Sequence, residues 1–161
     1  MSSIAPTDIA LIEEHIRRLI VVMGFTDTKV TCSYRTVAAQ HYLHVSLIAG
    51  PAGRLLIGTH GAHLQALQHI VRALIKRQVR EPVRITVDVN GYLASKERTL
   101  LHLAQEAARK AGRTGRAIVL PPMSAAARRT IHTTLAARQD VNTESLGEEP
   151  NRRVVVRPIF I

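Results

Sequence analysis

Two glycines three residues apart, Gly58 and Gly61, most constrain how this chain can fold. They lie in the stretch GRLLIGTHGAHLQAL, residues 53–67, in which leucine and isoleucine precede and follow the pair. The pattern predicts a short helix, a tight turn and a second helix, because glycine permits positive φ and close approach of another backbone. The free N–H groups at the start of the second helix would point toward whatever lies against the turn. A sugar-phosphate backbone would fit there.

Two other interpretations use the same letters. The spacing Gly53-x4-Gly58 is that of a nucleotide-binding P-loop, but Thr59 and His60 stand where that motif needs Lys and Ser/Thr. The P-loop is therefore disfavoured. An ordinary turn between two helices, with no ligand, stays open because an isolated G-x-x-G is common.

Charge sets the class of partner that we expect. The 161 residues include 22 Lys and Arg against 12 Asp and Glu, which gives a net charge of +10. Most of the excess lies between residues 51 and 138. Polyanions are the natural partners of such a field. Aromatic residues make up only 3% of the chain, so a nucleic-acid site built as an aromatic platform, as in RRM sheets, is not expected.

Cysteine use and apolar runs indicate the compartment. Cys32 is the single cysteine, so an internal disulfide is excluded, and no signal peptide opens the sequence. No apolar run approaches the roughly 20 residues that a membrane span needs. We therefore expect a cytoplasmic protein without a transmembrane segment.

The first half of the chain predicts the order helix, strand, strand, helix, glycine turn, helix, strand. Apolar residues recur at helical spacing from Ile9 to Met23, with Thr7 or Asp8 as N-cap. Residues 28–34, 42–48 and 83–89 have the composition or alternation of strands, and residues 62–78 form an amphipathic helix that Pro82 ends. His41 and His44 would face opposite sides of their strand, so they are not expected to share a metal ion.

In the second half, Asn90-Gly91 marks the expected domain boundary. A long helix over 92–112, a short strand over 116–120, a helix that Ser124 opens and strands over 140–146 and 153–158 follow. Arg128 and His132 are four residues apart on the helix that Ser124 opens. They therefore share a helical face and could bind one oxyanion. Taken alone the pair is a weak signal, and a surface arginine beside a satisfied histidine remains the alternative.

The order of elements, with Ile-Gly-x-x-Gly between two helices, resembles a KH domain of the prokaryotic topology (type II). For residues 1–90 the resemblance implies a three-stranded mixed sheet with three helices and a loop that clamps about four nucleotides. It places an apolar groove beside the loop, formed by Leu56, Ile57, Leu64 and the neighbouring strand. The clamp itself would be Gly58, Thr59, His60 and Gly61.

This loop departs from the KH pattern in charge. KH loops often carry Lys or Arg between the glycines, whereas Thr59 is neutral and His60 is only partly charged near pH 7. We therefore expect the affinity for phosphate to come from Arg54, Arg72 and Lys76. Replacing both glycines by Asp is expected to remove binding by this loop and to spare the fold.

Residues 91–161 resemble an R-3-H domain, a module that binds single-stranded nucleic acid. The letters that carry this are PPM (121–123), RRTIH (128–132) and VNTESLGEEPNRRVVVRP (141–158). The resemblance implies helices packed on a small sheet, so the whole chain is expected to be α+β with two small domains. It also implies that Arg128 and His132 contact phosphate or base, with Arg152 and Arg153 near that surface.

A KH domain followed by an R-3-H domain is similar to the Jag family, bacterial proteins described as associated with the SpoIIIJ membrane insertase. Many Jag proteins carry a further N-terminal domain, for which this sequence shows no counterpart. The resemblance implies a non-catalytic binder of single-stranded RNA, or of single-stranded DNA, that acts as a post-transcriptional regulator or RNA chaperone. It also implies that the helix over residues 65–78 pairs with a second small KH protein or with a second copy of this chain. We expect no cofactor, metal ion or small-molecule substrate.

The sequence allows two functions other than RNA binding. One is a protein-interaction adaptor in cell-envelope or cell-shape regulation, whose positive charge only aids solubility. The other is an enzyme acting on nucleic acid, with His132 as general base and Arg128 stabilising charge. Catalysis is disfavoured because no carboxylate cluster for Mg²⁺ lies near either motif.

Overall fold

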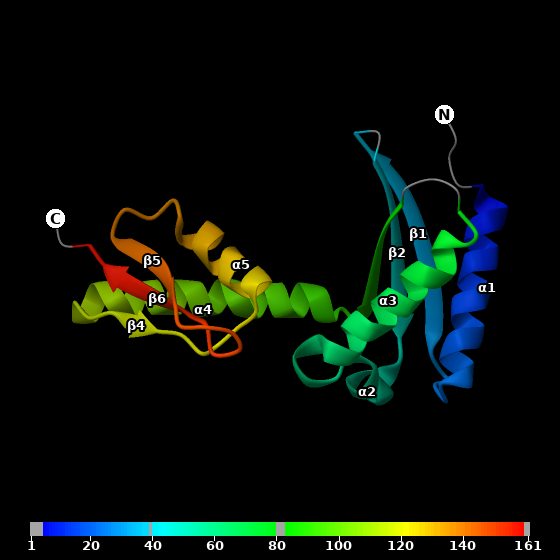
Figure 1. Cartoon of the computed structure of the whole chain (residues 1–161), viewed down its shortest axis with the longest axis horizontal. Coiled ribbons are helices and arrows are strands. Elements are labelled where there is room, and N and C mark those ends of the chain that lie inside the picture. Colours follow the sequence, from blue (N-terminus) through cyan, green and yellow to red (C-terminus); the bar gives the residue numbers. More distant parts are fainter. Residues whose placement is uncertain (1–4, 39, 80–82, 160–161) are drawn as a thin grey trace. The chain divides into compact units, whose positions relative to one another are not determined.

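The structure is a computed structural model that describes residues 5–38, 40–79 and 83–159 (Figure 1). The chain divides into two compact units, Met1–Leu93 and Ala94–Ile161. Each unit combines helices with a three-stranded sheet. The expected α+β class is therefore confirmed.

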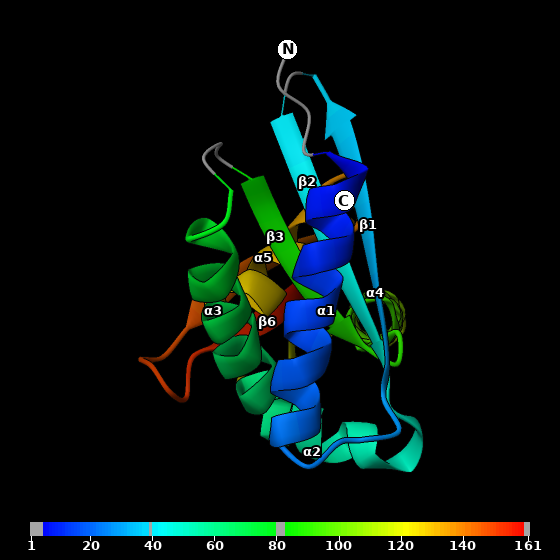
Figure 2. The same ribbon diagram turned by 90° about the vertical axis from the view of Figure 1, so that its right-hand side faces the viewer.

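In the first unit three helices accompany a mixed sheet. The elements are α1 (Pro6–Val22), β1 (Lys29–Val37), β2 (Gln40–Ile48), α2 (Gly53–Ile57), α3 (Ala62–Lys76) and β3 (Val83–Val89). The strand order is β1-β2-β3, with β1 antiparallel and β3 parallel to β2. Figure 2 shows α1 and α3 side by side on one face of this sheet. This is the arrangement that the resemblance to a type II KH domain implies.

The core of this unit follows from the two periodicities of its sequence. Residues at helical spacing in α1, namely Ile12, Ile16 and Ile20, are buried, and alternate residues of β2 are buried against them. Helix α3 closes the core with Leu64, Leu67, Val71 and Ile75. The remaining residues of each strand point to the face of the sheet opposite α1 and α3, which we call the open face.

Some expected boundaries differ from those in the structure. Helix α1 begins at Pro6 with Ala5 as N-cap, so the expected cap at Thr7 or Asp8 is wrong. Proline suits the first turn of a helix because its fixed φ is helical and its missing N–H would have no helical partner. Strands β1 and β2 extend to Val37 and from Gln40, beyond the expected limits. Pro82, expected to end the preceding helix, lies outside the described residues.

The second unit holds most of α4 (Tyr92–Thr114), followed by β4 (Ile118–Val119), α5 (Ala125–Leu135), β5 (Val141–Leu146) and β6 (Arg153–Pro158). The sheet is antiparallel in the order β4-β6-β5. Four alanines of α4 let the helix approach Ile131, Val154 and Val156 closely in a small core. Ser124 caps α5, as expected, because its hydroxyl accepts from Ala127 N at 3.4 Å.

Candidate nucleic-acid interface

The glycine turn forms where the sequence predicts it. Gly58 ends α2 with φ +69°, and its N–H donates to Arg54 O at 2.9 Å. His60 follows with φ +55° and Gly61 with φ +88° just before α3. Three residues with positive φ within four positions reverse the chain over a short distance, and Thr59 and His60 lie at the exposed tip.

Both glycines are required by their neighbours as well as by their backbone angles. A Cβ on Gly58 would lie 2.5 Å from the His63 ring, whose Nδ1 lies 2.7 Å from Leu55 O. A Cβ on Gly61, which is buried, would lie 3.1 Å from the Tyr92 ring. Replacing both glycines by Asp would therefore disturb the turn itself. The expectation that this change spares the fold does not fit the geometry.

Of the three residues named for the apolar groove beside the loop, Leu56 lines a pocket there together with Leu55, His63 and Ile70, whereas Ile57 and Leu64 do not line it. Leu56 and Leu64 are buried in the core of the first unit, and Ile57 is half-buried. Leu56 and Leu64 are only 2% and 4% exposed, so neither presents much surface to a ligand. The apolar side chain that α2 exposes is Leu55, at 67%.

The three basic residues expected to flank the loop differ in their hydrogen bonding and in their distance from the turn. Arg54 is exposed on α2, four residues before Gly58. Arg72 donates from Nε and Nη2 to Ile85 O on β3, at 3.2 and 3.1 Å, so much of its guanidinium already has a backbone partner. Lys76 is exposed at the end of α3, roughly 21 Å along the helix from Ala62. Of the three, Arg54 lies closest to the turn in sequence.

In the second unit, Arg128 is turned inward. Its side chain is 8% exposed, and Nη1 lies 2.8 Å from both Met123 O and Glu149 Oε1. The guanidinium therefore ties the segment before α5 to the loop between β5 and β6. Glu149 comes 21 positions after Arg128 in the chain, and the sequence analysis did not predict this contact.

His132 is held by the strand that faces it. Its Nδ1 lies 2.7 Å from Thr143 Oγ1 and its Nε2 lies 2.9 Å from Ser145 Oγ, both on β5. Arg128 and His132 share a helix, as expected, but their polar atoms have different partners. A ligand that contacts His132 would also contact the hydroxyl groups of Thr143 and Ser145.

Three further arginines lie around these residues. Arg152 is exposed at the end of the loop that carries Glu149, and its carbonyl accepts from Met123 N at 3.1 Å. Arg153 is half-buried and donates from Nε to Asn151 O at 3.2 Å. Arg129 is exposed on α5, and our sequence reasoning did not select it. Its position beside Arg128 in the motif was a signal for it.

Other arginines of this unit are neutralised by carboxylates. Arg109 pairs with Glu106, Arg138 with Asp140, and Arg157 with Glu144. The hydrogen bond from Arg138 lowers the pKa of Asp140, so the carboxylate stays charged at neutral pH. These pairs reduce the positive field locally, whereas Arg129, three residues before His132, and Arg152, beside the loop that carries Glu149, are exposed cations outside these pairs.

No metal centre emerges from the described part of the chain. Within residues 5–38, 40–79 and 83–159, no three His, Cys, Asp or Glu side chains are grouped so that they could hold a metal ion. Burial raises the pKa of the Cys32 thiol to about 11, which keeps it protonated near neutral pH. None of the helices described here combines the length and apolar character that a membrane crossing requires.

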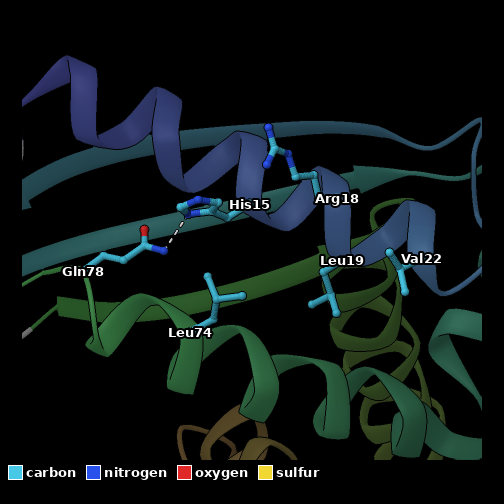
Figure 3. Close-up of a pocket in the computed structure, with 6 residues that line it drawn as sticks. All are labelled: His15, Arg18, Leu19, Val22, Leu74 and Gln78. Carbon is cyan, nitrogen blue, oxygen red and sulfur yellow. Dashed lines mark hydrogen bonds between the residues drawn. The ribbon is translucent and has the colours of Figure 1, made fainter.

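A groove runs between α1 and α3, on the helical face of the first unit (Figure 3). One polar contact bridges the two sides, where Gln78 Nε2 donates to His15 Nδ1 at 2.6 Å. The side chains that line the groove are His15, Arg18, Leu19, Val22, Leu74 and Gln78. Val22, the last residue of α1, is 85% exposed. The groove borders residues 65–78, where pairing with another protein was expected.

Comparison with known protein families finds a match within the second unit. Residues 98–158 match the family of R-3-H domains. The second unit carries an R-3-H domain. This R-3-H domain includes all of α5, β5 and β6, and thus Arg128, His132, Thr143, Ser145, Glu149 and Arg152.

Proteins named RNA-binding protein KhpB are similar to the chain beyond its R-3-H domain. The KhpB of Bacillus subtilis is 32% identical over 137 residues, which cover 84% of this chain and 62% of that protein. Those of Lactiplantibacillus plantarum and Clostridium symbiosum are 37% and 36% identical over 102 residues, which cover 63% of this chain. The matches cover 32% and 46% of those two relatives, so the chain spans only part of their length. These relatives confirm the expected resemblance to the Jag family.

Proposed function

We propose that this protein binds single-stranded RNA through both units and is not an enzyme. The observation that carries the proposal is the similarity to a protein named RNA-binding over 137 residues, which is more than the R-3-H domain alone. The net charge of +10 supports it, because a polyanion is the partner that such a charge attracts. We assign residues 1–90 to a KH domain and residues 91–161 to the R-3-H domain.

The contacts with RNA are divided between the two domains in this proposal. Gly58, Thr59, His60 and Gly61 position the strand, and Arg54 supplies charge beside them. Arg72 and Lys76 contribute less, because Arg72 is bonded to β3 and Lys76 lies far along α3. In the R-3-H domain His132 contacts RNA together with Arg152 and Arg153, while Arg128 holds the surface in shape.

Fluorescence anisotropy with a labelled, unstructured single-stranded RNA tests the proposal. Affinity should fall steeply between about 50 and 200 mM salt, with a slope of log K against log salt of about −0.7 for each phosphate contacted. The RNA should stay intact during long incubation with and without Mg²⁺. Absence of binding at low salt would exclude this function, and cleavage of the RNA would exclude the non-catalytic part of it.

The finer cellular roles belong to the same proposal. A protein of this kind would act in the cytoplasm as a post-transcriptional regulator or an RNA chaperone. The groove between α1 and α3 supports a second role in protein contact, because its lining is largely apolar and Val22 is open to solvent. A second small KH protein or a second copy of this chain would occupy it, and an adaptor in cell-envelope regulation would use the same surface.

A further inference from the structure

The open face of the first unit's sheet carries a row of three side chains that the glycine turn does not involve. The strand register places Arg35 of β1 opposite Tyr42 of β2, and Tyr42 beside Arg84 of β3. The strand neighbours on either side of each belong to the other face, where Leu43 and Ile85 are buried in the core. Arg35 and Arg84 are exposed, and Tyr42 is half-buried between them. We call these three residues the sheet row.

The central ring of the sheet row is already arranged for stacking. The Arg35 guanidinium carbon lies 5.8 Å from the centroid of the Tyr42 ring, a cation–π contact, and Tyr42 OH donates to Gln40 Oε1 at 2.8 Å. The ring and the guanidinium are the two kinds of flat surface on which unpaired bases stack. One such ring on a strand suffices for a single base, although the chain is too poor in aromatics for a full platform.

The charge around the sheet row is of one sign. The strands β1, β2 and β3 contain a single acidic residue, Asp88. Its carboxylate is buried and accepts from the N–H groups of Val89 and Leu93, at 2.9 and 3.0 Å. The open face adds Lys29 and His44 to the two arginines of the row, together with hydroxyl groups of Ser33 and Thr86. A phosphate backbone meets no repelling carboxylate from these strands.

We propose that the sheet row binds a further segment of single-stranded RNA, with one base stacked on Tyr42 and Arg35 and the phosphates beside Arg35 and Arg84. This inference rests on the proposed function and adds a second surface to the first unit. Ile48, the last residue of β2, lies six positions after Tyr42, which corresponds to about 20 Å along the strand, and α2 then leads from that end of the sheet to the glycine turn. The row and the turn are therefore distinct contacts, on opposite ends of the sheet.

Paired charge variants test the proposal against a matched control. Arg35→Gln with Arg84→Gln removes two charges from the open face, and Arg17→Gln with Arg77→Gln removes one exposed charge from α1 and one from the residue just after α3. In anisotropy titrations with a long unstructured RNA, the open-face pair should lower affinity about tenfold and reduce the salt slope by about 1.4, the value for two phosphates. The control should change affinity less than about twofold. Equal effects of the two pairs would overturn the proposal.

The ring is tested separately. Tyr42→Phe keeps the stacking surface and should bind like the unmodified protein, whereas Tyr42→Leu should weaken binding about tenfold. Circular dichroism checks that each variant stays folded. If the unmodified protein binds RNA and Tyr42→Leu binds as well as Tyr42→Phe, the sheet row is not a contact, while RNA binding elsewhere stands. If the unmodified protein does not bind, the proposed function fails and this inference fails with it.

Discussion

At the scale of single residues, Arg128 combines a charged group with an interior position. Among the described residues it is the one arginine that is buried, and its guanidinium joins Met123 O and Glu149 across two segments of the R-3-H domain. A buried cation is tolerated when its donors are used, as they are here. The first residue of the Arg-x3-His pair thus supports the surface, and exposed neighbours are free to meet a ligand.

Substitution of Arg128 should therefore affect stability before it affects binding. We expect Arg128→Ala to lower the free energy of unfolding by about 2 kcal/mol, because it removes a charged hydrogen bond and leaves Met123 O without that donor. Arg129→Ala, on the exposed side of the same helix, should change it by no more than about 0.5 kcal/mol. Urea unfolding followed by circular dichroism measures both. Equal stability of the two variants would contradict the supporting role of Arg128.

The burial of Arg128 could have been predicted from the sequence, but its partner could not. Arg128 lies three residues before Ile131 and seven before Leu135, and both of these are buried. Helical periodicity therefore places all three on one face. Glu149 comes from a loop two elements later in the chain, and nothing local indicates which carboxylate such a loop brings to a buried arginine. The same holds for the hydroxyls of Thr143 and Ser145 at His132.

At the scale of elements, the glycine turn is both the candidate contact and a structural joint. Gly61 packs beneath the Tyr92 ring at the start of α4, and Gly58 packs beside His63 in the first turn of α3. The loop therefore connects α2 and α3 and also touches the residues just after β3. Its exposed tip, in contrast, consists of Thr59 and His60.

A clean test of this loop changes the tip and keeps the glycines. Thr59→Asp with His60→Asp should weaken RNA binding about tenfold, because two negative charges would face the phosphates. Asp tolerates the left-handed angles that His60 adopts, so the turn should form. Thr59→Ser with His60→Asn is the neutral control and should bind within about twofold of the unmodified protein. Anisotropy measures affinity, and unchanged thermal unfolding of all variants would show that the loop was not broken.

Elements were predictable where the periodicity was strong. Strand β3 was expected over residues 83–89 and is found at Val83–Val89, since its alternate residues are apolar and Asn90-Gly91 follows. The start of α1 was missed, because two good capping residues, Thr7 and Asp8, competed with Pro6. The apolar groove was predicted only in part, because the pattern of Leu56 and Leu64 indicates an inward face, whereas Leu55 and Ile70, which line the pocket with Leu56, are exposed.

At the scale of the whole molecule, the proposed function has the two units of one chain bind the same RNA strand. Each unit contributes a small set of exposed cations, and neither set is large. Linking two weak sites raises the effective concentration of the second once the first is bound. The net charge of +10 also favours fast encounter with RNA at low salt.

The contribution of each unit should therefore depend on RNA length. With a long strand, Thr59→Asp/His60→Asp in the first unit and Arg129→Ala/Arg152→Ala in the second should each lower affinity about tenfold, and their combination about a hundredfold. With an RNA of about four nucleotides, which one unit can hold, each set alone should change affinity no more than about twofold. Anisotropy with the two RNAs measures this. Equal losses on both would show that the units do not act on one strand.

The bonds from α3 to the outer edge of β3 have a further consequence. Arg72 donates to Ile85 O and Gln68 Oε1 accepts from Val87 N, so two backbone groups on the free edge of the sheet are already satisfied. An unpaired edge would be a template for adding a strand from another molecule, and hence for aggregation. These hydrogen bonds make Arg72 less available to a ligand. The same bonds help to prevent a strand of another molecule from pairing with the edge of β3.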